Sequence, residues 1–169
     1  MQLTEFFAAQ LEREVDRSRR ALARVPEGRG DWKPHAKSMA LGYLSTLVAT
    51  MPDWVALMID KDNLDLNPPG GGGYKPASPA NNRELLEAHD AAAERARKAL
   101  RGTTDAHLLT NWQLLVAGHV VSEEPRHVMI GDTFTHLAHH RGQLTVYLRL
   151  NDVAVPALFG PSADDKSFS

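Results

Sequence analysis

PRHVMIGDTFTHLAHHRGQLTVYLRL, residues 125–150, is the stretch that decides the fold. Pro125 suits a first-turn position, where its missing N–H costs no hydrogen bond, and Glu123 and Glu124 before it favour the positive end of a helix. The apolar residues that follow recur with a helical period, as Ile130, Phe134, Leu137, Leu144 and Leu148. The sequence therefore predicts a long helix with one face in a core.

Three further stretches show the same period. They cover residues 3–25, 38–61 and 81–102. Ser38 stands where an N-cap is expected, and Asn81 and Glu84 have the spacing of a capping box. Pro52 removes a backbone hydrogen bond inside the second stretch, so it should kink that helix or split it in two. Four amphipathic helices predict an all-α protein with the architecture of a four-helix bundle.

The two longer connections differ in character. In NWQLLVAGHVVSEEP, residues 111–125, apolar residues alternate on either side of an Ala117-Gly118 pair, which predicts a short hairpin or extended lid before the last helix. NPPGGGGYKPASPANN, residues 67–82, holds four consecutive glycines. Because glycine loses much entropy on ordering and offers nothing to pack, we expect a flexible loop there.

The composition is that of a single globular domain spanning residues 1–169. Nineteen basic and 21 acidic residues leave a net charge of -2, so no broad positive surface is available for nucleic acid. No apolar run has the length of a membrane span, and the early charges of the N-terminus do not resemble a signal peptide, so we expect a cytoplasmic protein. Cysteine is absent, so any metal ligands must be histidine or carboxylate.

The candidate chemistry lies at His136 and His140. Four residues apart on a helix, the two imidazoles stand one above the other and can chelate one zinc, nickel or iron ion, whereas His139 points elsewhere. The alternative is a pair of ordinary boundary histidines. A zinc protease is excluded, because that motif needs glutamate directly after its first histidine and Leu137 occupies the position.

Two longer segments carry a family resemblance. WKPHAKSMALGYLSTLVATMPDW (32–54) and THLAHHRGQLTVYLRLNDVAVPALFGPSADD (135–165) resemble the DinB-like superfamily of four-helix bundles, and the likeness extends over nearly the whole chain. Its members are described as metal-dependent hydrolases or thiol transferases. The resemblance implies a divalent metal held by three histidines, two of them at His136 and His140, and it implies a homodimer.

The third ligand of that site is missing. The histidine that the resemblance places on the second helix falls at Leu47, which cannot coordinate a metal. Metal binding should then be weak or absent, unless water, a carboxylate or another histidine completes the shell. His119, in the predicted hairpin, is the substitute considered, whereas His35 matches a structural position in WKPH.

Two functions remain open on this evidence. One is a metal-dependent hydrolase or thiol transferase acting on a small-molecule substrate. The other is a catalytically degenerate bundle, which has kept the fold without turnover and serves as a small-ligand binding or stress-associated protein. Arg141 projects near the middle of an apolar stripe, so it should pair with a buried acid or lie at a dimer interface, together with the alanine-rich third helix. Tyr147 either packs or orients a ligand, and the three tryptophans are first of all core anchors.

Overall fold

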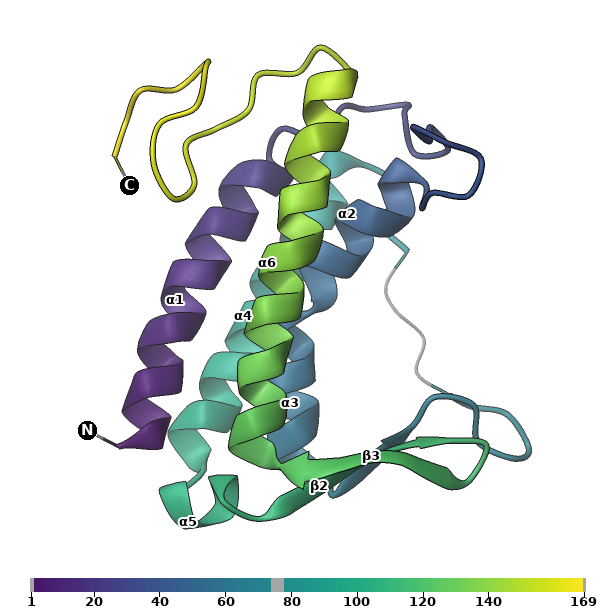
Figure 1. The fold of residues 1–169 in the computed structure, drawn as a ribbon, viewed down its shortest axis with the longest axis vertical. Coiled ribbons are helices and arrows are strands. Elements are labelled where there is room, and N and C mark those ends of the chain that lie inside the picture. The colour runs from purple at the N-terminus through teal and green to yellow at the C-terminus, as the bar shows by residue number, and fades with distance from the viewer. Residues whose placement is uncertain (1, 74–77, 169) are drawn as a thin grey trace.

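The computed structural model describes residues 2–73 and 78–168. Helices dominate this part of the chain, as Figure 1 shows. They are α1 (Leu3–Leu22), α2 (Leu41–Thr50), α3 (Pro52–Asp60), α4 (Asn82–Gly102), α5 (Asp105–Leu108) and α6 (Arg126–Leu150). Three short strands accompany them, β1 (Asn63–Asp65), β2 (Asn111–Val116) and β3 (His119–Pro125).

The long helices form the predicted bundle. α1, α4 and α6 run side by side, and α2 and α3 together take the place of the fourth helix (Figure 1). The stripe predicted for the last helix is confirmed, because all five of its apolar residues are buried. They contribute to two core clusters, one near α5 and the sheet and one near the C-terminal end of α6.

Pro52 divides the second predicted helix. α2 and α3 meet at Met51 and are bent by 47° relative to each other, which confirms the predicted break. The predicted cap at Ser38 is wrong, since Ala40 occupies the N-cap of α2. No single helix in the described ranges is long and apolar enough to cross a membrane; the bent α2–α3 pair meets that test, but much of it is packed in the core.

A small mixed sheet corrects the all-α prediction. The predicted hairpin is confirmed as β2 and β3, which pair antiparallel, and β1 adds to β2 in parallel to give the order β1-β2-β3. β1 has only three residues and is held by an existing strand, so its sequence carries almost no strand signal of its own. The fold is therefore a helical bundle with a three-stranded sheet at one end rather than a pure four-helix bundle.

The hairpin turn is clamped from outside. Ala117 and Gly118 both have positive φ values, 51° and 80°, as a two-residue type I′ turn requires. Asp65, at the end of β1, accepts hydrogen bonds from the amides of both residues at 3.1 and 2.7 Å. This carboxylate offsets the unfavourable left-handed conformation of Ala117 and fixes the tip of the hairpin.

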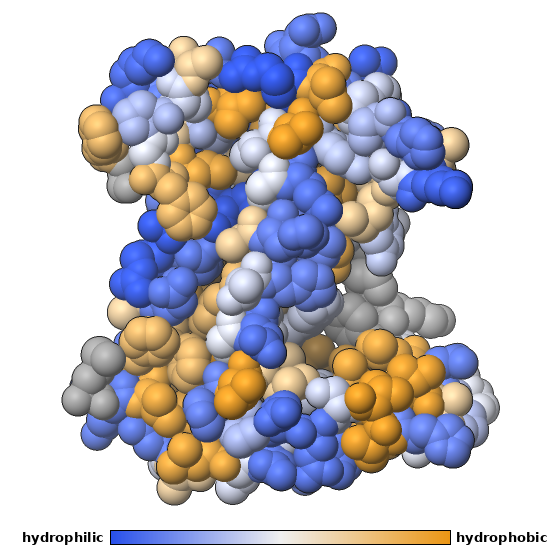
Figure 2. Space-filling model, viewed as in Figure 1, coloured by the Kyte–Doolittle hydropathy of each residue, from blue (hydrophilic) through white to orange (hydrophobic). Residues whose placement is uncertain are grey.

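The remaining segments lie on the surface of the bundle, where hydrophilic and hydrophobic residues are interspersed on the face seen in Figure 2. Residues 67–73 and 78–80 form neither helix nor strand, in keeping with the predicted loop, while positions 74–77 of that loop lie outside the described residues. The C-terminal tail crosses from the end of α6 to α1 (Figure 1). Arg149 pairs with Asp164, and Arg20 donates to the Ala157 carbonyl at 2.7 Å.

Candidate functional site

His136 and His140 face each other on α6. Their Nε2 atoms are 2.8 Å apart, and their ring centroids are separated by 4.6 Å. His140 is 8% exposed, whereas His136 lies at the surface of the helix. The sequence prediction that one helical turn would stack these two rings is confirmed, and their distance is that of a hydrogen bond between the two nitrogens.

Gln143 continues the contact on the same helix. Its Oε1 lies 2.8 Å from His140 Nδ1, and its Nε2 lies 3.1 Å from Nε2 of His139. An amide oxygen accepts only, so His140 donates from Nδ1 to Gln143 in this arrangement, and its Nε2 shares a hydrogen bond with His136. Gln143 thus fixes the ring orientation of His140, as an outer partner does for a histidine ligand.

A cleft opens beside His136. Its volume is about 800 Å³, and α2, α3, α6 and the loops at residues 30–31 and 78–79 contribute to its wall. Trp54 of α3 lies with its ring centroid 5.6 Å from that of His136. We call this the His136 cleft; Asp31, Tyr43, Leu47 and Trp54 line it together with His136.

His136 is tuned toward its neutral form. Partial burial lowers the pKa of its imidazole, and the neighbouring His140 and His139 lower it further. At neutral pH the cleft therefore presents an uncharged imidazole as one of its polar groups.

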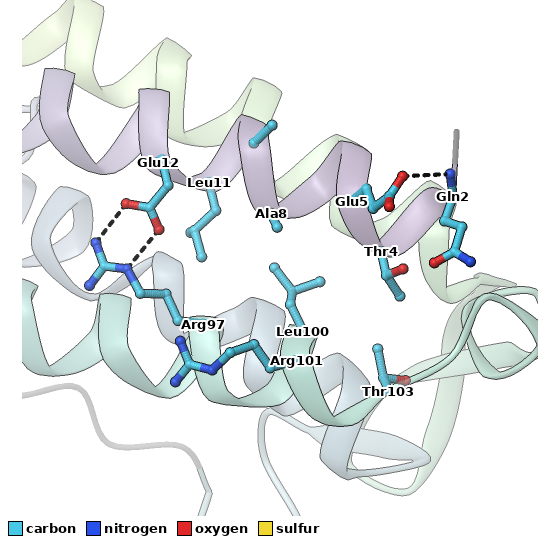
Figure 3. A pocket seen from close by; sticks show the side chains of 11 residues that line it. Gln2, Thr4, Glu5, Ala8, Leu11, Glu12, Arg97, Leu100, Arg101 and Thr103 are labelled. Carbon is cyan, nitrogen blue, oxygen red and sulfur yellow. Dashed lines mark hydrogen bonds and ion pairs between the residues drawn. The ribbon is translucent and has the colours of Figure 1, made fainter.

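Other hollows on the surface lack this chemistry. Figure 3 shows a groove of about 610 Å³ between α1 and α4, in which Glu12 faces Arg97. Arg97 binds Glu12 through two hydrogen bonds of 2.7 and 2.9 Å, so these charges are already satisfied. A third hollow, of about 770 Å³, lies between α3 and α4 and includes His107, whose Nε2 lies 2.9 Å from the Ile59 carbonyl oxygen. Of these three, the His136 cleft alone adjoins the histidine pair.

Solved structures give the fold a name. A crystal structure of a DinB-like protein from Bacillus cereus ATCC 10987 is similar with a TM-score of 0.69 and 18% sequence identity, over 90% of this chain and 95% of that one. A DinB-like protein from Bacillus subtilis is similar with a TM-score of 0.66 and 14% identity, over 95% of this chain and 99% of that one. This chain has the DinB-like fold. Neither a family model nor a curated protein matches the sequence.

The DinB-like fold does not by itself supply a complete metal centre here. Leu47, the position from which the resemblance implies a third histidine, lines the same cleft as His136. Within residues 2–73 and 78–168, no group of three or more His, Asp or Glu side chains is arranged to hold a metal. A three-histidine centre therefore does not fit the residues present.

The other candidate ligands lie elsewhere. His119 begins β3 at the tip of the hairpin, opposite Val116, so the structure gives no support to it as a substitute. His35 accepts a hydrogen bond from the Lys37 amide at 3.1 Å, a local loop contact in line with a structural role.

Arg141 and Tyr147 have structural partners. Arg141 is 1% exposed and lies 2.6 Å from Glu14 of α1, which confirms the predicted pairing with a buried acid. Tyr147 donates to the Met39 carbonyl at 3.2 Å and packs edge-on against Trp32, as the packing interpretation expects.

The sequence reasoning missed most of the cleft wall. Asp31, Tyr43 and Trp54 come from three separate segments, and no spacing rule links them. Gln143 could have been found, because it stands three residues after His140 on one helix and the polar pairing of such positions is a general rule.

Proposed function

We propose that the protein binds a small, largely apolar molecule in the His136 cleft and does so without a metal. The observation that carries this proposal is that Leu47 and His136 line one cleft. At position 47, where the resemblance implies a third histidine ligand, the cleft is lined by the apolar side chain of leucine. An apolar cavity with a few fixed polar groups is the usual design of a small-molecule site.

The dimensions of the cleft support this function. Its volume of about 800 Å³ lies within the range of about 300–1,000 Å³ typical of ligand sites. Leu47 and Trp54 supply apolar surface, and His136 supplies a polar contact whose position is set by His140. Because His140 is itself held by Gln143, His136 is prearranged before any ligand arrives.

Dye binding tests the site directly. Nile red is neutral and becomes fluorescent in an apolar environment, so the wild-type protein should bind it in the cleft. Leu47→Trp places an indole in the cleft and should weaken dye binding at least about tenfold. Ala8→Trp is the matched control, since Ala8 lines the groove of Figure 3 instead. Equal loss in both variants, or no dye binding by the wild type, would refute the proposal.

A metal-dependent hydrolase or thiol transferase is the second candidate. Gln143 favours it, because an amide that accepts from Nδ1 of His140 leaves Nε2 with its lone pair toward His136. On this hypothesis Leu47→His restores the missing nitrogen and should raise zinc or nickel affinity at least about tenfold, while Leu47→His combined with His140→Ala should lose that gain. Calorimetry and elemental analysis of the purified proteins measure both. Tight zinc binding by the wild type, equal to that of Leu47→His, would favour this second function over the first.

A further inference from the structure

We infer that the His136 cleft takes an organic cation, that is, an amine or quaternary ammonium group attached to an apolar body. This inference rests on the proposed ligand-binding function and adds the charge of the ligand. It follows from the side chains that meet at the cleft: one carboxylate, two aromatic rings and a hydrocarbon wall.

The charge of the wall comes from Asp31. Among the described residues that line the cleft, Asp31 is the only Asp, Glu, Lys or Arg. The grooves on either side of α4 differ, because each brings basic and acidic side chains together. A cationic ligand in the His136 cleft would therefore meet one carboxylate and no lysine or arginine from these wall residues, whereas an anionic ligand would meet a like charge.

Two aromatic rings line the same cleft as that carboxylate. Trp54 lines the cleft next to His136, and Tyr43 lines it while 59% exposed. The face of an aromatic ring attracts a cation, and tryptophan does so most strongly. An exposed tyrosine gains little from packing, so its place at the mouth of the cleft is well suited to contact a ligand.

The start of α2 does not reverse this preference. A helix N-terminus normally attracts anions through its free N–H groups. Here the Leu41 amide donates to the Trp32 carbonyl at 2.9 Å, and the Gly42 amide donates to the Gly30 carbonyl at 2.8 Å. Two of the donors that an anion would use are already bound to backbone oxygens.

Three probes of similar size separate the possibilities. Benzyltrimethylammonium is a permanent cation, phenylacetate is an anion at neutral pH and benzyl alcohol is neutral. Calorimetric titration at low ionic strength should give the tightest binding for the cation. Asp31→Asn should weaken cation binding about twofold to fivefold, in line with the strength of exposed charge pairs, and should leave benzyl alcohol unchanged.

Matched variants keep the test specific. Asp16→Asn removes an equal charge from α1, where Asp16 pairs with Arg20, and should not change cation binding. Tyr43→Leu should weaken the cation about twofold to fivefold, while Tyr43→Phe, which keeps the ring, should retain most of the affinity. Tyr43 is exposed, so neither change threatens the fold.

The outcomes divide cleanly. Phenylacetate or benzyl alcohol binding as tightly as the cation, or Asp31→Asn acting no differently from Asp16→Asn, overturns the charge inference and leaves the ligand-binding function standing. Failure of all three probes to bind also overturns the charge inference, and it overturns the ligand-binding function only if the wild type fails to bind Nile red as well.

Discussion

The buried pair of Glu14 and Arg141 offers the sharpest test of how the core beside the site is built. The two side chains are 3% and 1% exposed, and Arg141 Nη2 lies 2.6 Å from Glu14 Oε2. Because both side chains are buried, the attraction between their charges is only weakly screened by solvent. Burial lowers the pKa of Arg141 while Glu14 opposes that shift. Removing one partner should strand the other charge in the interior.

The structure predicts unequal costs for the two halves. Breaking a buried ion pair typically destabilises a protein by about 3–5 kcal/mol. Arg141→Met leaves Glu14 with Arg17 at 2.9 Å and Gln10 at 3.1 Å, so its cost should lie at or below the lower end. Glu14→Leu leaves Arg141 with the Ser18 hydroxyl at 3.1 Å, a weak carbonyl contact and the Phe159 ring, whose centroid lies 5.4 Å from the guanidinium carbon. None of these partners carries a negative charge, so the cost should lie at the upper end.

Urea unfolding of the two single variants and the double variant measures these costs. At about 2–4 °C per kcal/mol for a chain of this size, Glu14→Leu should lower Tm by roughly 10–20 °C. The double variant should recover much of the stability, since two apolar side chains of similar volume can replace a buried pair. Glu14→Leu costing less than Arg141→Met, or a double variant no better than the worse single one, would show that the pair does not interact as described.

Further predictions concern a buried histidine, the hairpin turn and the oligomeric state. Burial lowers the pKa of His89, although two backbone carbonyl oxygens, each 3.1 Å from a ring nitrogen, oppose the shift. The unfolded chain therefore takes up a proton more readily than the folded one. Stability should fall as pH drops below about 6.5, and the loss of Tm on acidification should be smaller in His89→Gln. Ala117→Asn creates the Asn-Gly pair favoured in this turn and should stabilise by about 0.5–1 kcal/mol in urea, whereas Asp65→Ala should speed hydrogen exchange of the hairpin amides. Homodimer formation stays a prediction, and light scattering that gives a monomer mass at micromolar concentration would contradict it.

The dimer prediction has lost two of its supports. Arg141 forms a buried ion pair with Glu14 of the same chain. The alanines of α4 at positions 92, 93, 96 and 99 are buried in the bundle. Neither feature is available to a second copy. A residue that looks misplaced on a helical stripe can be paired internally by a distant helix, and one sequence alone does not distinguish that pairing from an interface.

The long helices could be predicted because each carries its own signal. Apolar residues of α1, α4 and α6 recur with a helical period. Pro52 lacks a backbone N–H, so it predicts the helix break at its own position. β1 and α5 have three and four residues, too few for any period, and depend on neighbours for their hydrogen bonds. Short elements of this kind are fixed by tertiary contacts. The all-α prediction therefore missed the sheet, in which β1 pairs with the distant strand β2.

The site follows the same division. His136 and His140 were predictable because a single helix sets their spacing. The cleft was not predictable, because tertiary packing brings Asp31, Leu47 and Trp54 to the same cleft as His136. That packing depends on the bend between α2 and α3 and on their contacts with α6. Polar burial on α6 also weakens its sequence pattern, since Arg126, Thr133, His140 and Arg141 all lie inside.

Position 47 links the two candidate functions. Leu47, at the position where the resemblance implies a third histidine, is also a side chain that makes this part of the cleft wall apolar. Leu47→His should therefore do two opposite things at once, because an imidazole that gains a metal also brings polar surface and an ion into the space that Nile red occupies. Zinc occupancy and release of the dye must then rise together across a zinc titration of this variant. A gain in metal affinity with dye binding unchanged would mean that the metal and the dye occupy separate places, and the ligand cleft would have to be sought away from His136.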